Sequence, residues 1–363
     1  MRLLHVTPFY EPCWGYGGMA RSSSALCRAL AARGHEVTVL TALLEPRSPT
    51  QELLGGVRVL RLPGPRWLSR RLVPWPFGMR DVLRRELPSA GVVHLHGVRN
   101  GLSATAARLL ASAGRSWLLT THGCYPHHRQ HVLLKSVFDR LAARAVLDGA
   151  AEVIAVSEAE ARDLPRASRV IANGVAACGT PAATARGSGP PRLLFVGSDA
   201  PQKRGVLLPS LLAAVPEAEL ELVGRFQPGF LRRFGASAGR VRARGVLGGE
   251  ALATAYAEAD LLVHPAVGEA FGLAPFEAAL AGTAAVVAGG HGCGEWYGRA
   301  GGCVVPPDDL TALVSAVTTR LCDSARSAAE ARAVAEFATV HLTWERTAQA
   351  IECLCREVAS RSR

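Results

Sequence analysis

Short apolar runs alternate with longer amphipathic segments along this chain. The first half contains the runs LLHVT, EVTVLT, VRVLRLP, VVHLHG, SWLLTTHG and EVIAVS. Segments whose apolar residues recur every three or four positions lie between several of them, notably residues 20–33 and the stretch VLLKSVFDRLAARAVLDG. Nearly continuous apolar strands that alternate with helices are typical of a parallel sheet covered on both faces. The pattern therefore predicts an α/β fold.

The pattern stops once and then resumes. Residues 177–191 are poor in large apolar side chains and rich in Pro, Gly, Ala and Thr, as expected of a linker. A second series of apolar runs follows: RLLFVG, ELELVG, VRARGVL, DLLVHPA, TAAVVAG and CVVPP. At 363 residues, two domains are the default. We expect an N-terminal domain over 1–176, a second domain over 192–340 and a terminal helix over 341–363.

The stretch HPAVGEAFGLAPFEAALAGTAAVV, residues 264–287, carries the clearest chemistry. It predicts a buried strand, then a loop, then a helix with Pro275 at its first position and Glu277 in its first turn. Backbone N–H groups and the helix dipole in front of such a loop suit a diphosphate. Glu269 and Glu277 suit the hydroxyls of a sugar or ribose. The alternative is that a glutamate in a first turn only complements the helix dipole.

The same stretch resembles the donor motif of the retaining glycosyltransferases of family 4, P-S-x-x-E-x-F-G-x-x-x-x-E-A-x-A-x-G-x-P-V-V. The positions in register are Pro265, Glu269, Phe271, Gly272, Glu277, Ala278, Gly282, Val286 and Val287, whereas Ala266 and Ala284 depart from the motif. The last helical segment, TWERTAQAIECLCREVA, resembles the terminal W-E helix of the family, which often packs back on the first domain. The resemblance implies the GT-B fold, two doubly wound Rossmann-like domains that face a cleft, with the donor site in the second domain and the acceptor side in the first.

The resemblance also implies roles for these residues. Glu277 takes the ribose hydroxyls and Glu269 the sugar hydroxyls. Backbone N–H groups of Phe271, Gly272 and Leu273 bind the sugar or phosphate. The leaving phosphate accepts the proton of the acceptor, so no residue is required as a nucleophile.

Two loops of the first domain also match the family. Gly17 and Gly18 precede the first helix, where a glycine pair lets backbone approach the donor phosphate; ordinary turn glycines are the alternative. His122 follows an apolar strand at the position where the family contacts the donor sugar, although packing alone could explain it. His127, His128 and His131 follow, but a metal site there lacks an evident third and fourth ligand, so we expect an acceptor entrance.

The loop VGSDAPQKRG departs from the family pattern G-R-x-x-x-x-K-G. Ser198 occupies the position of the Arg, and Lys203 and Arg204 compete for that of the Lys. The loss of one cation removes stabilisation of the leaving diphosphate unless another replaces it. Arg225 is the candidate replacement, with a solvated surface Arg as the alternative.

Two further segments take secondary roles by the same resemblance. Val246, with Gly245, falls in the segment that reads the base edge. Glu295 falls in a segment similar to G-G-x-x-E, with a structural or rim role.

Composition adds expectations about partners and location. Nine scattered cysteines suggest reduced thiols in a cytoplasm. The net charge of +11 favours anionic partners, yet no recognisable nucleic-acid-binding motif is present. The basic, aromatic stretch of residues 66–80, with Trp67, Trp75 and Phe77, suits the inner face of a membrane or an anionic acceptor. The alternative is a loop whose aromatic rings plug the first domain.

We therefore expect a retaining glycosyltransferase that moves a sugar from a nucleoside-diphosphate sugar to a hydroxyl acceptor. Envelope polysaccharide, a lipid intermediate and a natural product all fit as acceptors. We expect no cofactor and no metal, because Asp308 and Asp309 are adjacent at a helix start, where capping explains them. The rival hypothesis, made credible by Ser198, is a non-catalytic nucleotide-sugar-binding protein on the same fold.

Overall fold

The computed structural model describes residues 1–64, 76–124, 136–179 and 189–361. Contacts within the chain divide it into an N-terminal unit, Met1–Gly174 with Trp344–Arg363, and a C-terminal unit, Val175–Thr343. The acceptor and donor roles expected for the two units stay predictions.

The described part of the N-terminal unit contains one eight-stranded sheet, with the order β3-β4-β2-β1-β5-β6-β7-β8. Its strands are β1 Arg2–Val6, β2 Glu36–Ala42, β3 Gln51–Leu54, β4 Val57–Leu62, β5 Val92–His96, β6 Trp117–Thr120, β7 Ala150–Ala155 and β8 Arg169–Val170. All neighbours are parallel except β3, which pairs antiparallel with β4. Gly55 and Gly56 join that pair with φ angles of 55° and 80°, as a tight hairpin turn requires. The expectation of a wholly parallel sheet was wrong at this edge.

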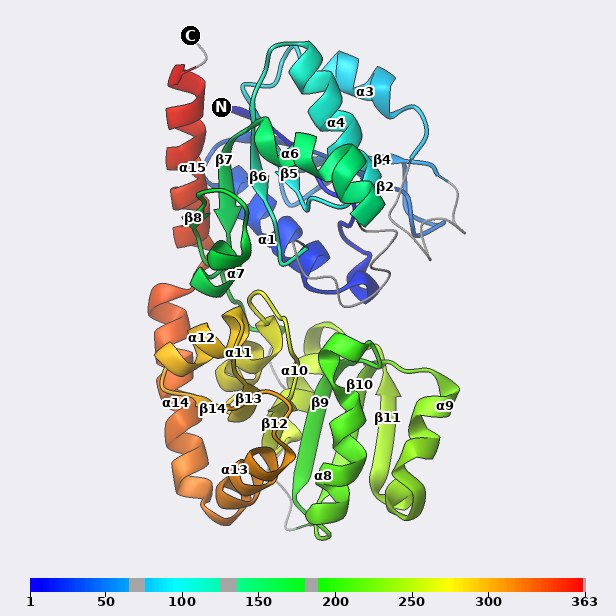
Figure 1. Ribbon diagram of the computed structural model, residues 1–363, viewed down its shortest axis with the longest axis vertical. Coiled ribbons are helices and arrows are strands. Elements are labelled where there is room, and N and C mark those ends of the chain that lie inside the picture. Colours follow the sequence, from blue (N-terminus) through cyan, green and yellow to red (C-terminus); the bar gives the residue numbers. More distant parts are fainter. Residues whose placement is uncertain (65–75, 125–135, 180–188, 362–363) are drawn as a thin grey trace. The chain divides into compact units, whose positions relative to one another are not determined.

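Helices cover both faces of this sheet (Figure 1). One face packs against α1 Gly18–Ala32 and α15 Trp344–Arg361, with Leu26, Leu30, Ile351 and Leu354 in its core. The other face packs against α3 Met79–Glu86, α4 Gly101–Ser112 and α6 Arg144–Asp148. Short elements complete the unit: η1 Trp14–Tyr16, η2 Asp139–Ala143 and α7 Glu158–Asp163. Both β5 and β6 are buried along their whole length, as expected of parallel strands covered on both faces, although β5 carries His94 and His96 among its apolar residues.

The terminal helix α15 belongs to the N-terminal unit, as expected of a helix that packs back on the first domain. Arg33, which follows α1, donates from Nε to Glu352 at 2.7 Å. Thr347 Oγ1 donates to the carbonyl of Ala172 at 2.9 Å. These bonds and the shared apolar face hold the end of the chain against the first sheet.

The described part of the C-terminal unit contains one six-stranded parallel sheet, with the order β11-β10-β9-β12-β13-β14. Its strands are β9 Arg192–Ser198, β10 Glu219–Arg225, β11 Val241–Gly245, β12 Leu261–His264, β13 Ala285–Ala288 and β14 Cys303–Val305. The connections contain α8 Leu208–Ala214, α9 Pro228–Leu231, α10 Gly249–Glu258, α11 Leu273–Leu280, α12 Gly292–Arg299, α13 Leu310–Cys322 and α14 Ser324–His341, with the 3-10 turns η3 Pro201–Lys203, η4 Gly205–Leu207 and η5 Arg232–Arg240. Both units are therefore doubly wound α/β sheets, as expected.

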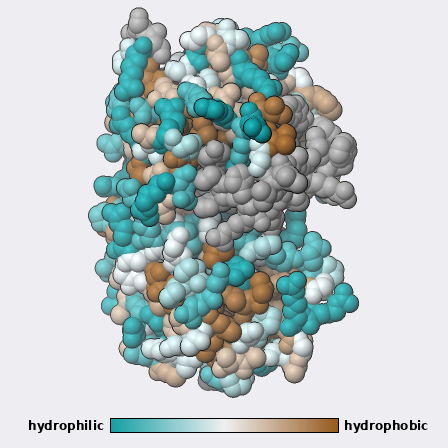
Figure 2. Space-filling model, in the orientation of Figure 1, coloured by the Kyte–Doolittle hydropathy of each residue, from teal (hydrophilic) through white to brown (hydrophobic). Residues whose placement is uncertain are grey.

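The surface bears on the membrane hypothesis. Hydrophilic residues cover much of the face drawn in Figure 2, and hydrophobic ones gather on it in the middle of the C-terminal unit. Phe77 is 63% exposed, but Trp67 and Trp75 lie outside the described residues. Within the described ranges, no helix is both long and apolar enough to cross a membrane. All nine cysteines lie within the described residues and are thiols outside any disulfide.

Candidate functional site

The loop after β12 turns directly into helix α11. The helix begins at Leu273, two residues earlier than expected, so Pro275 is its third residue. Gly272 allows the early start, because its φ of 73° suits a chain that turns sharply into a helix. Pro275 is tolerated because the first N–H groups of a helix have no partner within it. A Cβ on Gly272 would lie 2.4 Å from Cys293 Sγ, so a side chain has no room there.

Glu277 consequently lies in the second turn of α11 and not in the first. Its side chain is buried, at 7% exposure, and accepts a hydrogen bond of 2.8 Å from the hydroxyl of Tyr256 on α10. Phe271, before the helix, is buried against Phe276, with ring centroids 5.6 Å apart. The carboxylate is therefore held by a buried partner, which dipole complementation alone does not require.

Glu269 and Lys203 form an ion pair in front of this helix. Lys203 Nζ lies 2.5 Å from Glu269 Oε2, and each side chain is 24% exposed. The backbone joins the two loops as well, because Val267 N donates to the carbonyl of Gln202 at 2.8 Å. Burial alone would raise the pKa of Glu269, but the charge of Lys203 and the bond to it outweigh burial and lower the pKa to about 2. Glu269 is therefore ionised at neutral pH.

Arg204, the other candidate for the lysine position, points elsewhere. Its guanidinium pairs with the carboxylate of Asp308. Both residues have positive φ angles, 53° and 61°, which are unusual outside glycine. The structure thus brings Lys203, and not Arg204, to Glu269. Asp309 caps α13 by accepting from Ala312 N at 2.9 Å, as expected.

Ser198 and Arg225 lie side by side at the carboxyl ends of β9 and β10, where they are register partners. Arg225 is exposed and has no ion-pair partner among the described residues. Gly224 next to it cannot take a side chain, because a Cβ would lie 1.6 Å from the carbonyl oxygen of Gly197. Val246, just past β11, is 52% exposed. The arrangement leaves the compensating role of Arg225 open to test.

Two buried histidines beside Glu269 went unnoticed in the sequence. His264 ends β12, and its Nε2 lies 4.0 Å from Glu269 Oε2. Burial and the charge of Lys203 lower its pKa to about 3. His291 contacts two backbone carbonyls of the loop, that of Ala266 at 2.7 Å and that of Glu269 at 3.1 Å. The sequence did show a histidine on each side of the motif, His264 at the end of β12 and His291 immediately before α12.

In the N-terminal unit, Gly17 and Gly18 stand at the start of α1, as expected. Gly17 precedes the helix with a φ of 93°, a conformation that glycine adopts readily, and Gly18 is the first helical residue. Both are exposed, and a Cβ at either would meet no atom within 4 Å. Space for a ligand is therefore present at this helix start.

His122 follows β6 with a φ of 51°. Buried Glu160 holds the residues on both sides of it, since Glu160 Oε1 accepts from the side-chain hydroxyl of Thr121 at 2.6 Å and from the backbone N–H of Gly123. Ser157 caps α7 by accepting from Glu160 N at 3.1 Å. In a full capping box the glutamate side chain also accepts from the backbone N–H of the serine, but that of Glu160 accepts from Val156 N, so only the serine half of the box is present.

His122 is also one of four histidines that the strand order brings together. His96 contacts His122, and His5 and His94 lie beside His96 on β1 and β5. One nitrogen from each of His5, His94 and His96 lies within 4.8 Å of the others, a spacing that could hold a metal ion. Burial lowers the pKa of His5 to about 3 and that of His122 to about 4. His127, His128 and His131 lie outside the described residues.

Comparison with known proteins assigns the family. Residues 16–177 match the model of Glycosyltransferase Family 4, and residues 190–323 match that of Glycosyl transferases group 1. The chain belongs to glycosyltransferase family 4. A glycogen synthase from Mycobacterium tuberculosis is 29% identical to this family 4 glycosyltransferase over an alignment of 400 residues, gaps included. The alignment covers 96% of this chain and 93% of the relative.

Solved structures show that this family 4 glycosyltransferase has the GT-B fold. Sucrose-phosphate synthase from Thermosynechococcus elongatus matches with a TM-score of 0.79 and 23% identity, covering 99% of this chain and 100% of that one. HepE from Anabaena, in complex with UDP and glucose, matches with a TM-score of 0.75 and 18% identity, covering 98% and 100%. At these identities the likeness concerns the fold.

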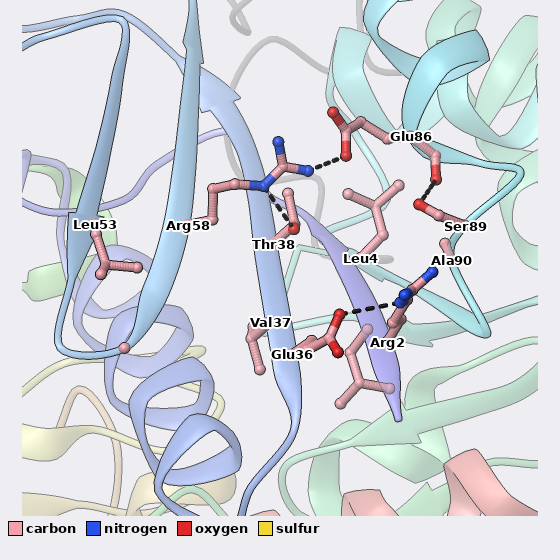
Figure 3. A pocket seen from close by; sticks show the side chains of 12 residues that line it. Arg2, Leu4, Glu36, Val37, Thr38, Leu53, Arg58, Glu86, Ser89 and Ala90 are labelled. Carbon is pink, nitrogen blue, oxygen red and sulfur yellow. Dashed lines mark hydrogen bonds and ion pairs between the residues drawn. The ribbon is translucent and has the colours of Figure 1, made fainter.

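One pocket of the family 4 glycosyltransferase lies away from these residues. It has a volume of about 350 Å³ and opens at the amino ends of β1, β2 and β4. Figure 3 shows Arg2 reaching Glu36 and Arg58 reaching Glu86 across it. In open α/β sheets, ligands gather beyond the carboxyl ends of the strands. The candidate residues are therefore those near the carboxyl ends of the strands, His122 in the N-terminal unit and Glu269 with Glu277 in the C-terminal unit.

Proposed function

We propose that the protein transfers a sugar, with retention of anomeric configuration, from a nucleoside-diphosphate sugar to a hydroxyl acceptor. The observation that carries the proposal is the Lys203–Glu269 ion pair in front of helix α11. It sets one cation and one carboxylate before a helix whose first N–H groups have no intrahelical partner. A diphosphate linked to a polyol complements that combination.

Each residue of this group has a role in the proposal. Lys203 binds the diphosphate, and the N–H groups of Phe271, Gly272 and Leu273 bind the phosphate or the sugar. Glu269, released from Lys203, accepts from sugar hydroxyls. Glu277, oriented by Tyr256, accepts from the ribose hydroxyls.

The remaining candidates assist binding. His122 binds a hydroxyl of the donor sugar, and Gly17 and Gly18 let backbone approach the phosphate. Arg225 supplies the positive charge that Ser198 lacks, and the segment of Val246 contacts the edge of the nucleotide base. Arg204 is an alternative phosphate ligand that must first leave Asp308.

The chemical step breaks the bond between the anomeric carbon and the phosphate oxygen and forms the bond to the acceptor oxygen. The acceptor proton passes to the leaving phosphate, and the products are a glycoside and a nucleoside diphosphate. The charge that develops on the phosphate is met by Lys203, Arg225 and the helix N–H groups. No divalent metal and no other cofactor is required in the proposal, because these groups supply the neutralising charge.

The relatives support a nucleotide-sugar donor, since HepE has been crystallised with UDP and with UDP-glucose. The acceptor is proposed only as a class: envelope polysaccharide, a lipid intermediate or a natural product. A cytoplasmic location with attachment to an anionic membrane surface is part of the proposal. Co-sedimentation with anionic vesicles that falls with salt supports the attachment, and its absence at low salt refutes it.

A panel of nucleoside diphosphates and their sugars tests the proposal. A ligand of the folded protein must raise its melting temperature by mass action. The best nucleotide sugar is then incubated with candidate acceptors, and release of the free nucleotide is followed together with the product. Binding without transfer or donor hydrolysis favours the rival, a non-catalytic nucleotide-sugar-binding protein. Absence of any nucleotide binding contradicts both.

A further inference from the structure

Three histidines of the N-terminal unit form a chain of hydrogen bonds that ends at His122. His5 Nδ1 lies 3.0 Å from His96 Nε2, and His96 Nδ1 lies 2.9 Å from His122 Nε2. The three side chains come from β1, from β5 and from the segment after β6, which are consecutive strands of the sheet. His5 and His96 are at most 1% exposed. The row of hydrogen-bonded histidines therefore runs from the fully buried His5 to His122, the candidate residue for contact with the substrate.

The ring geometry supports true hydrogen bonds. The ring centroids of His5 and His96 are 5.3 Å apart with a tilt of 26°, and those of His96 and His122 are 5.2 Å apart with a tilt of 22°. In both pairs the centroid separation exceeds the nitrogen separation by the same amount, about twice the distance from an imidazole centre to its nitrogen. Each contact therefore lies along a line through both rings, as a linear N–H···N bond requires.

His94 provides a contrast within the same cluster. Its ring centroid is only 4.3 Å from that of His96, with a tilt of 29° and no hydrogen bond between the rings. Its Nε2 instead lies 2.8 Å from Thr120 Oγ1. His94 thus packs on the face of His96 without being a member of the chain.

The number of protons constrains the direction of the chain. Burial lowers the pKa of all three histidines, so each is a neutral imidazole at pH 7, with one N–H donor and one bare acceptor. His96 therefore donates to one neighbour and accepts from the other. Both bonds must run in the same direction, and the proton position on His5 and that on His122 are coupled.

We propose that His5, acting through His96, is a positioning residue that fixes which ring nitrogen of His122 carries the proton. The chain occupies Nε2 of His122, so Nδ1 is left as either a donor or an acceptor for a substrate. The proton placement is a property of the resting protein. Only its use, toward a sugar hydroxyl, rests on the proposed function.

A metal ion is the competing occupant of this cluster. Two nitrogens bound to one tetrahedral Zn²⁺ at about 2.0–2.1 Å lie roughly 3.3 Å apart, further than the 3.0 Å between His5 and His96. The group of His5, His94 and His96 also contains no carboxylate to offset a double charge. Both observations favour a proton between the rings.

The test reads the histidine nitrogens by NMR in protein labelled with ¹⁵N-histidine, with His122 assigned from the His122→Phe variant. In the full-length protein, His5→Leu should change the ratio of the two neutral forms of His122 by about 3- to 10-fold, as expected when one net hydrogen bond is removed. His5→Phe serves the same comparison if the leucine variant is unfolded. His94→Leu, the matched control, should leave the ratio unchanged.

A double-mutant cycle separates coupling from packing. His96→Asn keeps a polar group for His122 but loses the reach to His5, so adding His5→Leu to it should change nothing further. The proposal is overturned if His5→Leu, made in the wild-type background, leaves the ratio of the two neutral forms of His122 unchanged. It is also overturned by one equivalent of Zn²⁺ in the purified protein that is lost in both His5→Leu and His94→Leu.

Binding of the best nucleotide sugar from the panel completes the experiment. His5→Leu should weaken its affinity about 3- to 10-fold and leave that of the sugar-free nucleotide unchanged. If the NMR result holds and no nucleotide sugar binds the wild type, the proposed function fails while the proton placement stands. If nucleotide sugars bind and His122 ignores His5, only the present proposal fails.

Discussion

The two units carry different kinds of polar group at the carboxyl ends of their strands. In the N-terminal unit, four neutral histidines are buried or half-buried and form hydrogen bonds with one another and with Thr120, while Nδ1 of His94 has no partner among the described residues. In the C-terminal unit, the ion pairs Lys203–Glu269 and Arg204–Asp308 stay partly exposed. Neutral rings tolerate full burial because no charge is desolvated, whereas ion pairs are costly to bury. The residues of a partly exposed ion pair can leave each other and bind a substrate. A buried row of neutral histidines can only fix the orientation and proton position of the residue at its end.

Acid stability should give the largest effect and separate the two units. An unfolded histidine takes up a proton near pH 6.5, whereas burial lowers the pKa of folded His122 to about 4, that of folded His5 to about 3, and those of His94 and His96 well below 6.5. The contribution of these neutral, buried rings to the free energy of unfolding is therefore complete above pH 6.5. It is lost as the pH falls toward the pKa values of the folded protein. In that window, each fully titrating histidine lowers the free energy of unfolding by about 1.4 kcal/mol per pH unit.

The C-terminal unit should resist acid longer. It has two such histidines, His264 and His291, and the contribution of Glu269 is present above pH 4.5 and is lost only as the pH falls toward about 2. Amide hydrogen exchange, corrected for its intrinsic pH dependence, can follow both units at pH 7.5 and 5.5. Earlier loss of protection in the C-terminal unit would contradict the comparison.

Removal of a cation should give the next largest effect. Lys203→Ala and Arg225→Ala should each lower kcat about a hundredfold or more, as the loss of a group that stabilises transition-state charge does. Arg192→Ala is the matched control, because Arg192 stands at the amino end of β9 and pairs there with Glu258, and the change should alter kcat less than about fivefold. Full activity in Arg225→Ala, with activity lost in Lys203→Ala, would show that Lys203 suffices without compensation for Ser198.

Glu277 tests the ribose contact. Glu277→Ala removes a buried carboxylate and should weaken nucleoside-diphosphate affinity by about 1.5–3 kcal/mol, as expected for hydrogen bonds to a charged group. Glu250→Ala is the control, because this exposed glutamate also lies near a helix start but lacks a buried partner. Calorimetric titration on folded variants measures both. Equal nucleoside-diphosphate affinities in the two variants would mean that Glu277 has a structural role and does not bind the ribose.

Glu160 should affect the N-terminal unit by a smaller amount. Glu160→Gln puts an amide N–H₂ where one carboxylate oxygen now accepts from Gly123 N or the other from Val156 N, and it should lower the free energy of unfolding by about 1–2 kcal/mol. Glu158→Gln, an exposed change on the same helix, should stay within about 0.5 kcal/mol. Urea unfolding compares them, and equal stabilities would mean that the loop at His122 does not depend on Glu160.

The sequence predicted the C-terminal site better than the N-terminal one for a physical reason. Glu269 and Glu277 lie in one continuous motif, so their spacing alone brings them to the same loop and helix. The histidine chain joins residues 5, 96 and 122, which become neighbours only through the strand order β1-β5-β6. The H-x-H pattern in VVHLHG and the histidine in LLHVT were visible, but without the strand order nothing connected them.

Other details depended on backbone conformation or on distant partners. The early start of α11 follows from the positive φ of Gly272, which the pattern around Pro275 does not reveal. The ion pair of Arg204 with Asp308 could not be predicted either, because Asp308 lies about a hundred residues further along the chain. The antiparallel strand β3 was missed although Gly55 and Gly56 mark its turn, because four residues give too short an apolar pattern.

Nucleoside-diphosphate binding to three proteins tests the central claim most directly. The account assigns the diphosphate to the charged group of the C-terminal unit and not to the neutral histidines of the N-terminal unit. Calorimetric titration of wild type, Lys203→Ala and His122→Ala with the best sugar-free nucleotide should show binding by the wild type, at least about tenfold weaker binding by Lys203→Ala, and unchanged binding by His122→Ala. No binding by the wild type at millimolar nucleotide, or equal affinities in the wild type and Lys203→Ala, would contradict the account.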